Sequence, residues 1–476
     1  MKFRFIAVLF LSTLGAGQSL FGSAFAINEG GTRAQGMAGA FTAIADDGSA
    51  IFFNPAGMAF QKRTQMEMDA LAVVGLFRYF PSNVPQGVVT PEKGYSGLVK
   101  PKFIPVANLY LVKPVSKRVT FGFGMYAPFG LAANFTNFND GDPSQTKFPG
   151  RYAGSRGQLQ SIWLQPTVSY RLAENTSVAF GVAAVYTHLF LERSILNPLD
   201  DGADFGKEVA KAILPGTNVD QAAKSIGRLL PEGRFRAAVS SWSPGFSAGF
   251  MQKFNRGKSS FGFNFRSAVV HHLEGDGSFA FLPNSALAPF LPKDSTIDKL
   301  FPNQKIKGMI PTPATYSVGV ATPFLFNSLI AVDFMVQDFR RFKDLVINFS
   351  QTTDTATPAE QREAFDFRNS YIAKIGIEKN VKKIGDIRGG YSYDYSPVPD
   401  KSVGPIFPDS SRNNFTVGLS HRLGNMELSL FYQAMFFKKR TTDVADNDVQ
   451  WTNGTYDNFA HLAGAGMRIY LGKEAK

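Results

Sequence analysis

The sequence predicts an all-β fold, a fourteen-stranded antiparallel transmembrane β-barrel with an N-terminal hatch inside its lumen. Three observations support this prediction: an export signal at the start, fourteen segments in which apolar and polar residues alternate, and connections that are short and long in turn. The composition agrees with it. Of the 476 residues, 45 are Gly and 46 are Phe, and 18% are charged, which is below the roughly 25% of a typical soluble domain.

The composition also excludes several classes of protein. Because the sequence has no cysteine, it forms no disulfide scaffold, Cys-ligated zinc site, iron–sulfur site or cysteine nucleophile. The low charge argues against disorder, and a mean hydropathy of -0.08 argues against a bundle of transmembrane helices. The five histidines show no metal-ligand spacing, so we expect neither a metal nor another cofactor. The net charge of +12 comes from scattered cations, and we do not expect nucleic acid as a partner.

Residues 1–26 have the features of a secretory signal peptide. Lys2 and Arg4 form a basic start, an apolar stretch follows, and Ala24-Phe25-Ala26 is a small-x-small cleavage motif. The apolar stretch is too short to anchor the chain in a membrane. We therefore expect cleavage near Ala26 and a mature chain that is either a soluble secreted protein or an outer-membrane barrel.

Fourteen segments alternate apolar and polar residues with a period of two. In one of them Phe261, Phe263 and Phe265 alternate with Gly and Asn, which places the three rings on one face of a strand. In a membrane barrel that face points outward to lipid, and bacterial single-chain barrels have an even number of strands. The expected strands are 64–77, 101–113, 119–127, 158–171, 176–192, 235–254, 258–275, 307–324, 328–348, 366–379, 384–396, 412–424, 425–440 and 456–471.

The connections distinguish a barrel from a secreted sandwich. Short turns such as Pro114–Arg118 and Gly424-Asn425 alternate with long connections such as 128–157 and 193–234. Outer-membrane barrels have this asymmetry, with short periplasmic turns and long extracellular loops. A secreted sandwich has no reason to show it, so we favour the barrel and assign it residues 64–476.

Residues 27–63 precede the first strand and have no strand pattern. They are rich in Gly and Ala and contain turn signals at Asp46-Asp47-Gly48 and Asn54-Pro55-Ala56-Gly57. A barrel of this size has a lumen that would leak unless it is filled. We therefore expect this segment to fold into the lumen as a hatch.

Eight short motifs occur in order along the mature chain, and together they resemble the FadL family of outer-membrane long-chain fatty acid transporters, which includes the TodX-type channels. Phe339 stands where the family usually has Trp, and the chain ends in Gly-Lys-Glu-Ala-Lys instead of an aromatic residue, which bears on assembly. The motifs are Gly36–Met58, Tyr126–Leu131, Gly150–Ala153, Arg266-Ser267 with Leu273–Gly275, Pro311–Thr315, Phe339 with Phe342 and Leu345, Asp394–Pro399, and Pro408–Arg412.

The resemblance implies passive uptake of hydrophobic molecules, most of all long-chain fatty acids, without an energy source. Extracellular loops would capture the substrate, the lumen would bind it, and an opening in the wall beside an inward kink of the third strand would release it. The protein would be a monomer in the cell outer membrane, in contact with outer membrane lipid and lipopolysaccharide. An aromatic hydrocarbon uptake channel is the alternative, and a general porin, an adhesin and an outer-membrane hydrolase are weaker ones.

The candidate substrate-binding residues combine a cation with apolar loops. Arg193 resembles a family position that faces the substrate headgroup, where a buried guanidinium would pair bidentately with a carboxylate; the alternative is a solvated charge at a strand end. Lys343 is the expected second cation. Two long loops, 193–234 and 276–306, would form a groove for an acyl chain, unless they only pack against each other. Their candidate residues are Phe205, Ile213, Leu287 and Phe290.

The candidate gate residues lie in the hatch and in the third strand. Asn54, Pro55 and Ala56 would form a hatch tip packed against the kinked wall, or an ordinary turn. Gly122 and Gly124 would mark a bulge that bends the wall, or small residues that face a crowded lumen.

Asp394 is the remaining candidate of the gate. A carboxylate at this position would bridge the hatch to the wall, or would be a solvated polar residue of the lumen. We expect Arg412 and Asp409 to form a structural pair in the neighbouring loop.

Overall fold

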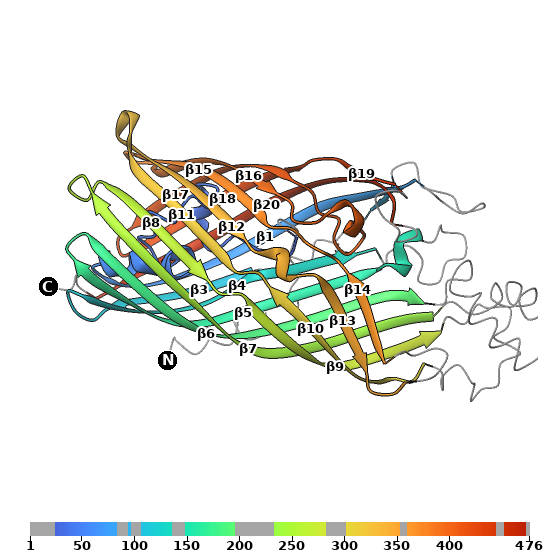
Figure 1. Cartoon of the computed structure of the whole chain (residues 1–476). Helices are drawn as coiled ribbons and strands as arrows, with labels where there is room; N and C mark the ends of the chain where they lie inside the picture. Colours follow the sequence, from blue (N-terminus) through green and yellow to red (C-terminus); the bar gives the residue numbers. More distant parts are fainter. Residues whose placement is uncertain are drawn as a thin grey trace, which may run out of the picture.

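The chain forms one closed antiparallel β-barrel whose lumen holds the N-terminal segment (Figure 1). The computed structural model describes residues 24–82, 94–96, 106–135, 148–195, 233–281, 301–352, 359–443 and 452–472. Strand β1 (Thr64–Pro81) pairs with β20 (Gly454–Leu471) along its whole length, and this pairing closes the sheet.

The wall has fourteen strand positions, as the sequence predicts. Ten of them each correspond to one predicted strand. These are β1, β3 (Val106–Pro114), β4 (Val119–Asn134), β5 (Arg156–Ala173), β6 (Thr176–Ile195), β7 (Gly233–Phe254), β16 (Gly385–Tyr395), β17 (Arg412–Leu423), β18 (Met426–Phe437) and β20; the short strands β2 (Tyr95–Ser96) and β19 (Arg440–Thr442) extend the sheet. However, β4 ends at Asn134 and not at 127, and β3 begins at Val106 and not at 101.

The other four positions are each built from two pieces, which the sequence did not predict. Three predicted strands are interrupted: 258–275 at residues 267–268, 307–324 at 313–314, and 328–348 at 338–343. Pro313 explains the second break, because it has no N–H for the ladder. The pieces are β8 (Ser259–Arg266) with β9 (Val269–Phe281), β10 (Gln304–Thr312) with β11 (Thr315–Phe324), β12 (Ser328–Gln337) with β13 (Asp344–Phe349), and β14 (Glu360–Ala364) with β15 (Ser370–Val381).

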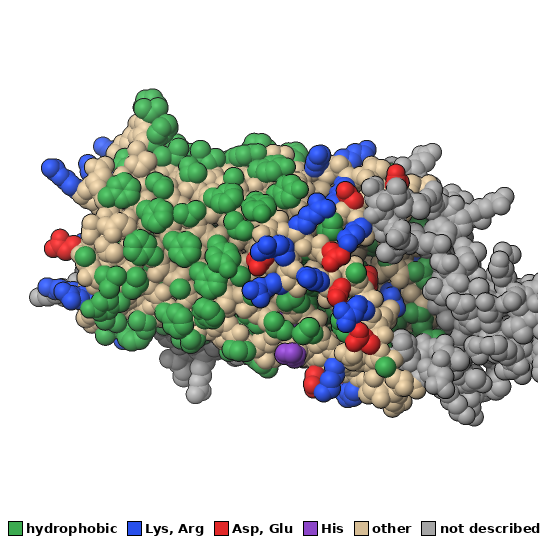
Figure 2. Space-filling view, in the orientation of Figure 1, with side chains coloured by type: hydrophobic (Ala, Val, Ile, Leu, Met, Phe, Trp, Pro, Cys, Tyr) green, Lys and Arg blue, Asp and Glu red, His purple; other side chains and the backbone are tan. Residues whose placement is uncertain are grey.

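The outer surface of the strands is apolar. Figure 2 shows a broad belt of hydrophobic side chains, while charged side chains gather toward the end that carries the long connections. The belt includes exposed Phe180, Trp242, Phe415 and Leu430, each on the outward face of its strand. This is the face that the alternation predicts to contact lipid. Among the described residues, no helix is long and apolar enough to cross a membrane.

The N-terminal segment lies inside the barrel and contacts opposite sides of its wall. It contains α2 (Thr32–Gln35), α3 (Ala50–Phe53) and the 3-10 helix η1 (Pro55–Phe60). The Phe41 and Thr42 N–H groups donate to Asp333 of β12 at 2.9 and 2.8 Å. From the other side, Asp69 of β1 accepts the Thr32 N–H at 2.9 Å. These wall carboxylates satisfy backbone donors that would otherwise be buried without a partner.

Glycines let the wall approach this segment closely. A Cβ at Gly262 of β8 would lie 2.2 Å from the Thr42 carbonyl oxygen, and a Cβ at Gly376 of β15 would lie 2.5 Å from the Met37 carbonyl oxygen. Both distances are too short for any side chain, and the obstacle is backbone. The Gly-rich composition therefore allows close packing between the wall and the lumenal segment.

We predict that Gly262→Ala lowers the free energy of unfolding of the barrel by about 1–3 kcal/mol, the usual cost of overpacking. Gly389→Ala is the matched control, because the nearest atoms to its Cβ lie at 3.9 Å. The measurement is the temperature at which the compact gel form is lost in detergent. Equal transitions in the two variants would show that the lumenal segment does not press on the wall at Gly262.

Candidate functional site

An apolar cavity lies in the lumen, on the side of the long connections. Its empty volume is about 710 Å³, a value that includes space open to solvent. Strands β4 to β7, β10 and β13 supply most of its apolar lining. Representative residues are Leu131, Leu159, Leu189, Phe235, Ile310 and Leu345.

Polar groups line this cavity together with the apolar ones. Arg193, the predicted headgroup residue, is half-buried near the end of β6 and lines the cavity. Its neighbour Glu192 is buried and also lines it, but Glu192 is matched by cations of β7. Arg236 Nε lies 2.6 Å from Glu192 Oε2, and Arg234 Nε lies 3.8 Å from Oε1. The charge of Glu192 is thus balanced within the wall.

A second carboxylate, Glu363, shares the cavity with Arg193. It lies on β14, beyond the apolar belt, next to exposed ion pairs such as Arg362–Asp344. Burial raises the pKa of Glu363, and the positive charge of Arg193 opposes this rise. Glu363 was not predicted, since an acidic residue in a loop hairpin carries no sequence signal of a lumenal position.

Phe25 also lines the cavity, and it was not among the predicted site residues. Its side chain is fully buried, and its ring centroid lies 5.1 Å from that of Phe339 and 5.3 Å from that of Phe342. Phe25 lies within the predicted cleavage motif, so the sequence places it in the signal peptide and not in the barrel.

The wall next to the cavity is irregular in β4, the predicted third strand. The pairing of β4 with β5 shifts register between Tyr126 and Phe129. The N-terminal segment covers this irregularity: Ala26 forms a bridge to Phe129, and the Ile27 N–H donates to the Pro128 carbonyl at 2.8 Å. Pro128 has no N–H, so the ladder is weakened at this point.

The glycines predicted to mark the bulge lie elsewhere, which corrects that prediction. A Cβ at Gly122 would lie 2.6 Å from Met58 Sδ, and a Cβ at Gly124 would lie 2.9 Å from Ile51 Cγ2. Both glycines therefore face the lumenal segment, the alternative that the sequence left open, and the register shift begins after Tyr126.

Asn54 contacts a different part of the wall from the one predicted. Its Nδ2 donates to the Thr42 and Phe250 carbonyls at 2.9 and 3.0 Å, and its Oδ1 accepts the Ala56 N–H. A Cβ at Gly249 would lie 3.1 Å from Pro55 Cδ. Asn54 and Pro55 thus pack against β7, and Ala56 is held by Ser177 of β6. The residues on either side of this turn, Ile51 and Met58, are the ones that contact β4 at Gly122 and Gly124.

Asp394 does not bridge the wall to the lumenal segment through its own ion pair. Arg412 Nη2 lies 2.6 Å from Asp394 Oδ2, and both residues belong to neighbouring wall strands. The pair expected between Arg412 and Asp409 is therefore replaced by Arg412–Asp394. Asp394 is buried, so it is not a solvated residue either.

The remaining candidates do not join the cavity. Lys343 is exposed just before β13 and is not among the residues that line the cavity, so the structure does not place this predicted second cation beside Arg193. Phe205, Ile213, Leu287 and Phe290 lie outside the described residues. Within the described ranges, no group of three or more His, Cys, Asp or Glu residues could hold a metal ion.

Arg266, which lies in one of the recognised motifs, links the lumenal segment to the irregular strand. It is buried, and its Nη2 donates to the Phe52 carbonyl at 2.8 Å. Its guanidinium lies 4.3 Å from the ring centroid of Phe52 and 5.4 Å from that of Tyr126. Cation–π contacts of this kind are strengthened by desolvation.

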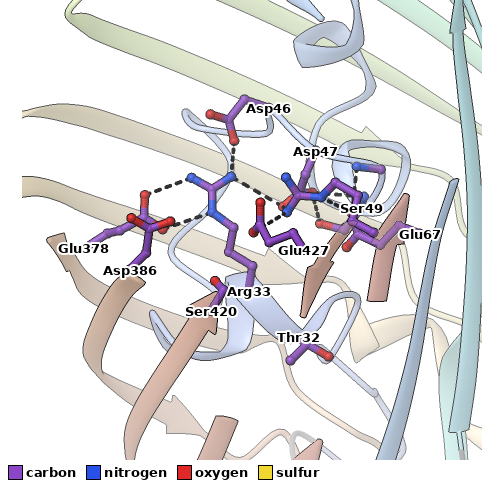
Figure 3. A network of polar contacts seen from close by, with 12 residues as sticks. Thr32, Arg33, Asp46, Asp47, Ser49, Glu67, Glu378, Asp386, Ser420 and Glu427 are labelled. Carbon is purple, nitrogen blue, oxygen red and sulfur yellow. Dashed lines mark hydrogen bonds and ion pairs between the residues drawn. The ribbon is translucent and has the colours of Figure 1, made fainter. Parts of the chain in front are cut away.

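A buried ionic network holds the lumenal segment near the short turns (Figure 3). Arg33 Nη2 lies 2.9 Å from Glu378 Oε1, and Arg33 also pairs with Asp46. Arg468 of β20 pairs with Asp47 at 3.3 Å, and with wall carboxylates as well. The network joins the segment to strands from both sides of the closure.

Comparisons with known proteins agree with this architecture. A family model described as outer membrane protein transport protein (OMPP1/FadL/TodX) matches residues 13–470. The 47 kDa outer membrane protein of Pasteurella multocida is 25% identical over 445 residues, 92% of this chain and 93% of that protein. The long-chain fatty acid transport protein of Salmonella typhi is 21% identical over 469 residues, 96% of this chain and 97% of that protein.

Solved structures show the same fold. A FadL homologue from Pseudomonas aeruginosa has a TM-score of 0.74 at 18% identity, over 94% of this chain and 100% of that chain. The toluene transporter TodX of Pseudomonas putida has a TM-score of 0.65 at 15% identity, over 93% of this chain and 99% of that chain.

We predict that Arg468→Met destabilises the folded barrel by about 3–5 kcal/mol, because it leaves buried carboxylates without their cation. Asp47 and Glu67, which face Arg468, have side-chain exposures of 0% and 4%. Arg362→Met is the control, since Arg362 is exposed, and it should show no measurable loss. Thermal unfolding in detergent, followed by circular dichroism, measures the difference. Similar transitions for the two variants would contradict a stabilising role for the network.

Proposed function

The chain belongs to the outer membrane protein transport family that includes FadL and TodX, and we propose that it takes up long-chain fatty acids by passive diffusion. The family consists of transporters and not of enzymes, and its members pass hydrophobic small molecules through an outer-membrane barrel. The observation that carries the fatty-acid proposal is the apolar cavity that contains the cation Arg193.

This cavity suits an acyl chain that ends in a carboxylate. Its apolar lining provides contact for the hydrocarbon, while a carboxylate buried without a partner would be strongly destabilised. A guanidinium offers the bidentate geometry that carboxylates prefer. Because Glu192 is already matched by Arg236, Glu363 is the carboxylate with which a ligand would compete for Arg193.

We propose that the ligand leaves sideways, beside the irregularity of β4. Leu131 of this strand lines the cavity, and the register shift between Tyr126 and Phe129 lies a few residues away on the same strand. The residues that cover the shift, Phe25 and Ala26, are not part of the wall. Lateral release would deliver a hydrophobic ligand to lipid without passage through water.

Aromatic hydrocarbon uptake is the second candidate, and one observation favours it. Several rings line the cavity, and a solved structural neighbour is a toluene transporter. A general porin is disfavoured because residues 24–60 occupy the lumen. The lining rings are Phe25, Phe235, Phe342, Phe365 and Phe407.

Two proposed partners concern the outside of the barrel. We propose that the protein works as a monomer surrounded by outer membrane lipid. Exposed cations near the long connections, such as Lys305 and Lys307, would face lipopolysaccharide phosphates.

The first experiment is the uptake of labelled oleate by Gram-negative cells that lack their own fatty-acid transporter, with and without this protein. Heat-modifiable gel mobility confirms in parallel that the barrel has assembled. Restored uptake supports the fatty-acid proposal. An assembled barrel without oleate uptake refutes it and favours an aromatic hydrocarbon, which labelled toluene then tests.

We predict that Arg193→Ala weakens oleate binding by about 1.5–3 kcal/mol, the value of hydrogen bonds to charged groups, which is roughly tenfold to a hundredfold in Kd. Lys343→Ala is the matched control, because it removes an exposed cation outside the cavity. Binding of labelled oleate to the purified proteins measures both. If the two variants bind alike, Arg193 does not hold the carboxylate.

We predict that Glu363→Gln increases oleate affinity severalfold at neutral pH, because it removes the carboxylate that competes for Arg193. Since burial raises the pKa of Glu363, acidification protonates Glu363 in the wild type and brings its affinity toward that of the variant. The measurement is oleate affinity as a function of pH for both proteins. If oleate affinity changes with pH in the same way in the wild type and in Glu363→Gln, Glu363 does not compete with the ligand for Arg193.

A further inference from the structure

A second pocket opens on the outer side of the wall, at the end that carries the long connections. Its lining comes from the ends of four neighbouring strands, β15 to β18. Tyr395 at the end of β16 lines it and is 43% exposed, while the preceding Asp394 is buried, so the pocket lies on the outward face. Its empty volume is about 690 Å³, a value that includes space open to solvent. It shares no lining residue with the lumenal cavity.

Cations dominate the lining of this outer pocket. They are Arg368, Lys438, Lys439 and Arg440, and Asp400 is the only carboxylate among the lining residues. Asp400 is occupied by Arg440, whose Nη2 lies 2.7 Å from its Oδ1. Within the described part of the chain, the side chains of the other three cations have no ion-pair partner. Cations gathered without a counter-charge repel one another, so the outer pocket favours an anionic ligand.

Backbone hydrogen bonds fix the chain beside these cations. The Arg368 N–H donates to the Pro397 carbonyl at 2.8 Å. The Lys438 N–H donates to the Ser411 carbonyl at 2.7 Å. The positions of the cations are therefore set by the rim of the wall, and a ligand would have to order side chains only, which lowers the entropic cost of binding.

The outer pocket also contains a buried hydroxyl. Ser410 lines it and is 6% exposed, and its Oγ has no hydrogen-bond partner among the described residues. A buried donor that is left without an acceptor destabilises the fold. An anion with several acceptor oxygens would satisfy this hydroxyl together with the cations, and phosphate is such an anion.

Exposed aromatic rings lie on the membrane side of the outer pocket, on the same four strands. The ring centroids of Tyr371 and Tyr395 are 6.4 Å apart, and those of Phe415 and Phe436 are 6.0 Å apart. All four side chains are exposed. Aromatic residues gather at the interfaces of membrane barrels, and in Figure 2 the apolar belt gives way to charged side chains toward this end. The outer pocket therefore lies at the level of lipid headgroups.

The long connections mark the extracellular end of the barrel, so the lipid beside the outer pocket is that of the outer leaflet. We propose that the outer pocket binds a phosphate group of lipid A, the membrane anchor of lipopolysaccharide, and that the acyl chains of the same molecule lie along the exposed rings of β15 to β18. The inference rests on the proposed contact with lipopolysaccharide and assigns that contact one site. It does not depend on which ligand the lumenal cavity takes.

A pair of substitutions tests the site in the full barrel purified in detergent. Lys438→Gln together with Lys439→Gln removes two cations of the outer pocket. An exposed cation beside an anionic headgroup contributes about fivefold in affinity, so this variant should bind lipid A about thirtyfold more weakly than the wild type. Titration with lipid A, followed by native mass spectrometry, measures the affinity. Heat-modifiable gel mobility confirms that each barrel has assembled.

The matched control removes the same charge elsewhere on the rim. Lys305→Gln together with Lys307→Gln changes two exposed lysines of β10 that each pair with a carboxylate outside the outer pocket. This variant should bind lipid A much more tightly than the pocket variant does. An equal loss of affinity in both variants would overturn the proposal, because lipid A would then be attracted by the rim as a whole.

Two further probes identify the part of the ligand that is bound. Lipid A without its phosphates keeps the acyl chains, and it should bind the wild type about as weakly as intact lipid A binds the pocket variant. Inorganic phosphate in excess should leave lipid A bound, because it lacks the acyl chains. Undiminished binding of dephosphorylated lipid A, or displacement by inorganic phosphate, would refute a lipid phosphate site.

The result is separable from the test of the fatty-acid proposal. A wild-type barrel that binds oleate but no lipid A would refute the outer site alone. A barrel that binds lipid A at the outer pocket but neither binds nor takes up oleate would refute the fatty-acid proposal and leave the lipid site standing.

Discussion

Closure of the sheet is the constraint on which the rest of this structure depends. In lipid, backbone N–H and C=O groups have no water to bond, so a spanning sheet must leave no free edge. Here β1 and β20 pair from Thr64 with Leu471 to Pro81 with Gly454. A closed wall of fourteen strands encloses a lumen too wide for wall side chains to fill, and the N-terminal segment occupies it. The wall carboxylates Asp333 and Asp69 then bind the backbone donors of that segment.

The irregular positions of the wall concentrate around the cavity. The break at residues 338–343 turns Phe339 and Phe342 inward, and the register shift in β4 brings Phe129 against Ala26. Each irregularity removes ladder bonds that a lipid-facing strand needs, so each requires a lumenal partner. Phe25 and Ile27 form backbone hydrogen bonds with β4, and the ring of Phe25 packs against both inward phenylalanines. The same contacts that repair the wall thus shape the cavity.

The sequence predicted the fourteen strands because lipid exposure imposes alternation on each of them. It did not predict the breaks inside three of them, since alternation continues on both sides of a kink. Contacts between segments that are distant in the sequence could not be predicted either. Arg468 and Asp47 are far apart in the chain, and no local sequence pattern pairs them. Lys343 lies in the break inside the predicted strand 328–348, where alternation no longer decides whether a side chain faces the lumen or solvent. Arg193 lines the cavity because its strand continues well past the apolar belt.

The charges of the cavity bear on the polarity of its ligand. A channel for neutral hydrocarbon gains nothing from a half-buried guanidinium, and desolvation of that group would weaken the barrel. The cavity keeps Arg193 and places Glu363 beside it, while the neighbouring Glu192 is satisfied by Arg236. Under the fatty-acid proposal, Glu363 would pair with Arg193 in the empty cavity and give way to the carboxylate of the ligand, an exchange that the raised pKa of the buried Glu363 favours. An exchangeable carboxylate next to a cation is the arrangement expected where the ligand itself carries a carboxylate.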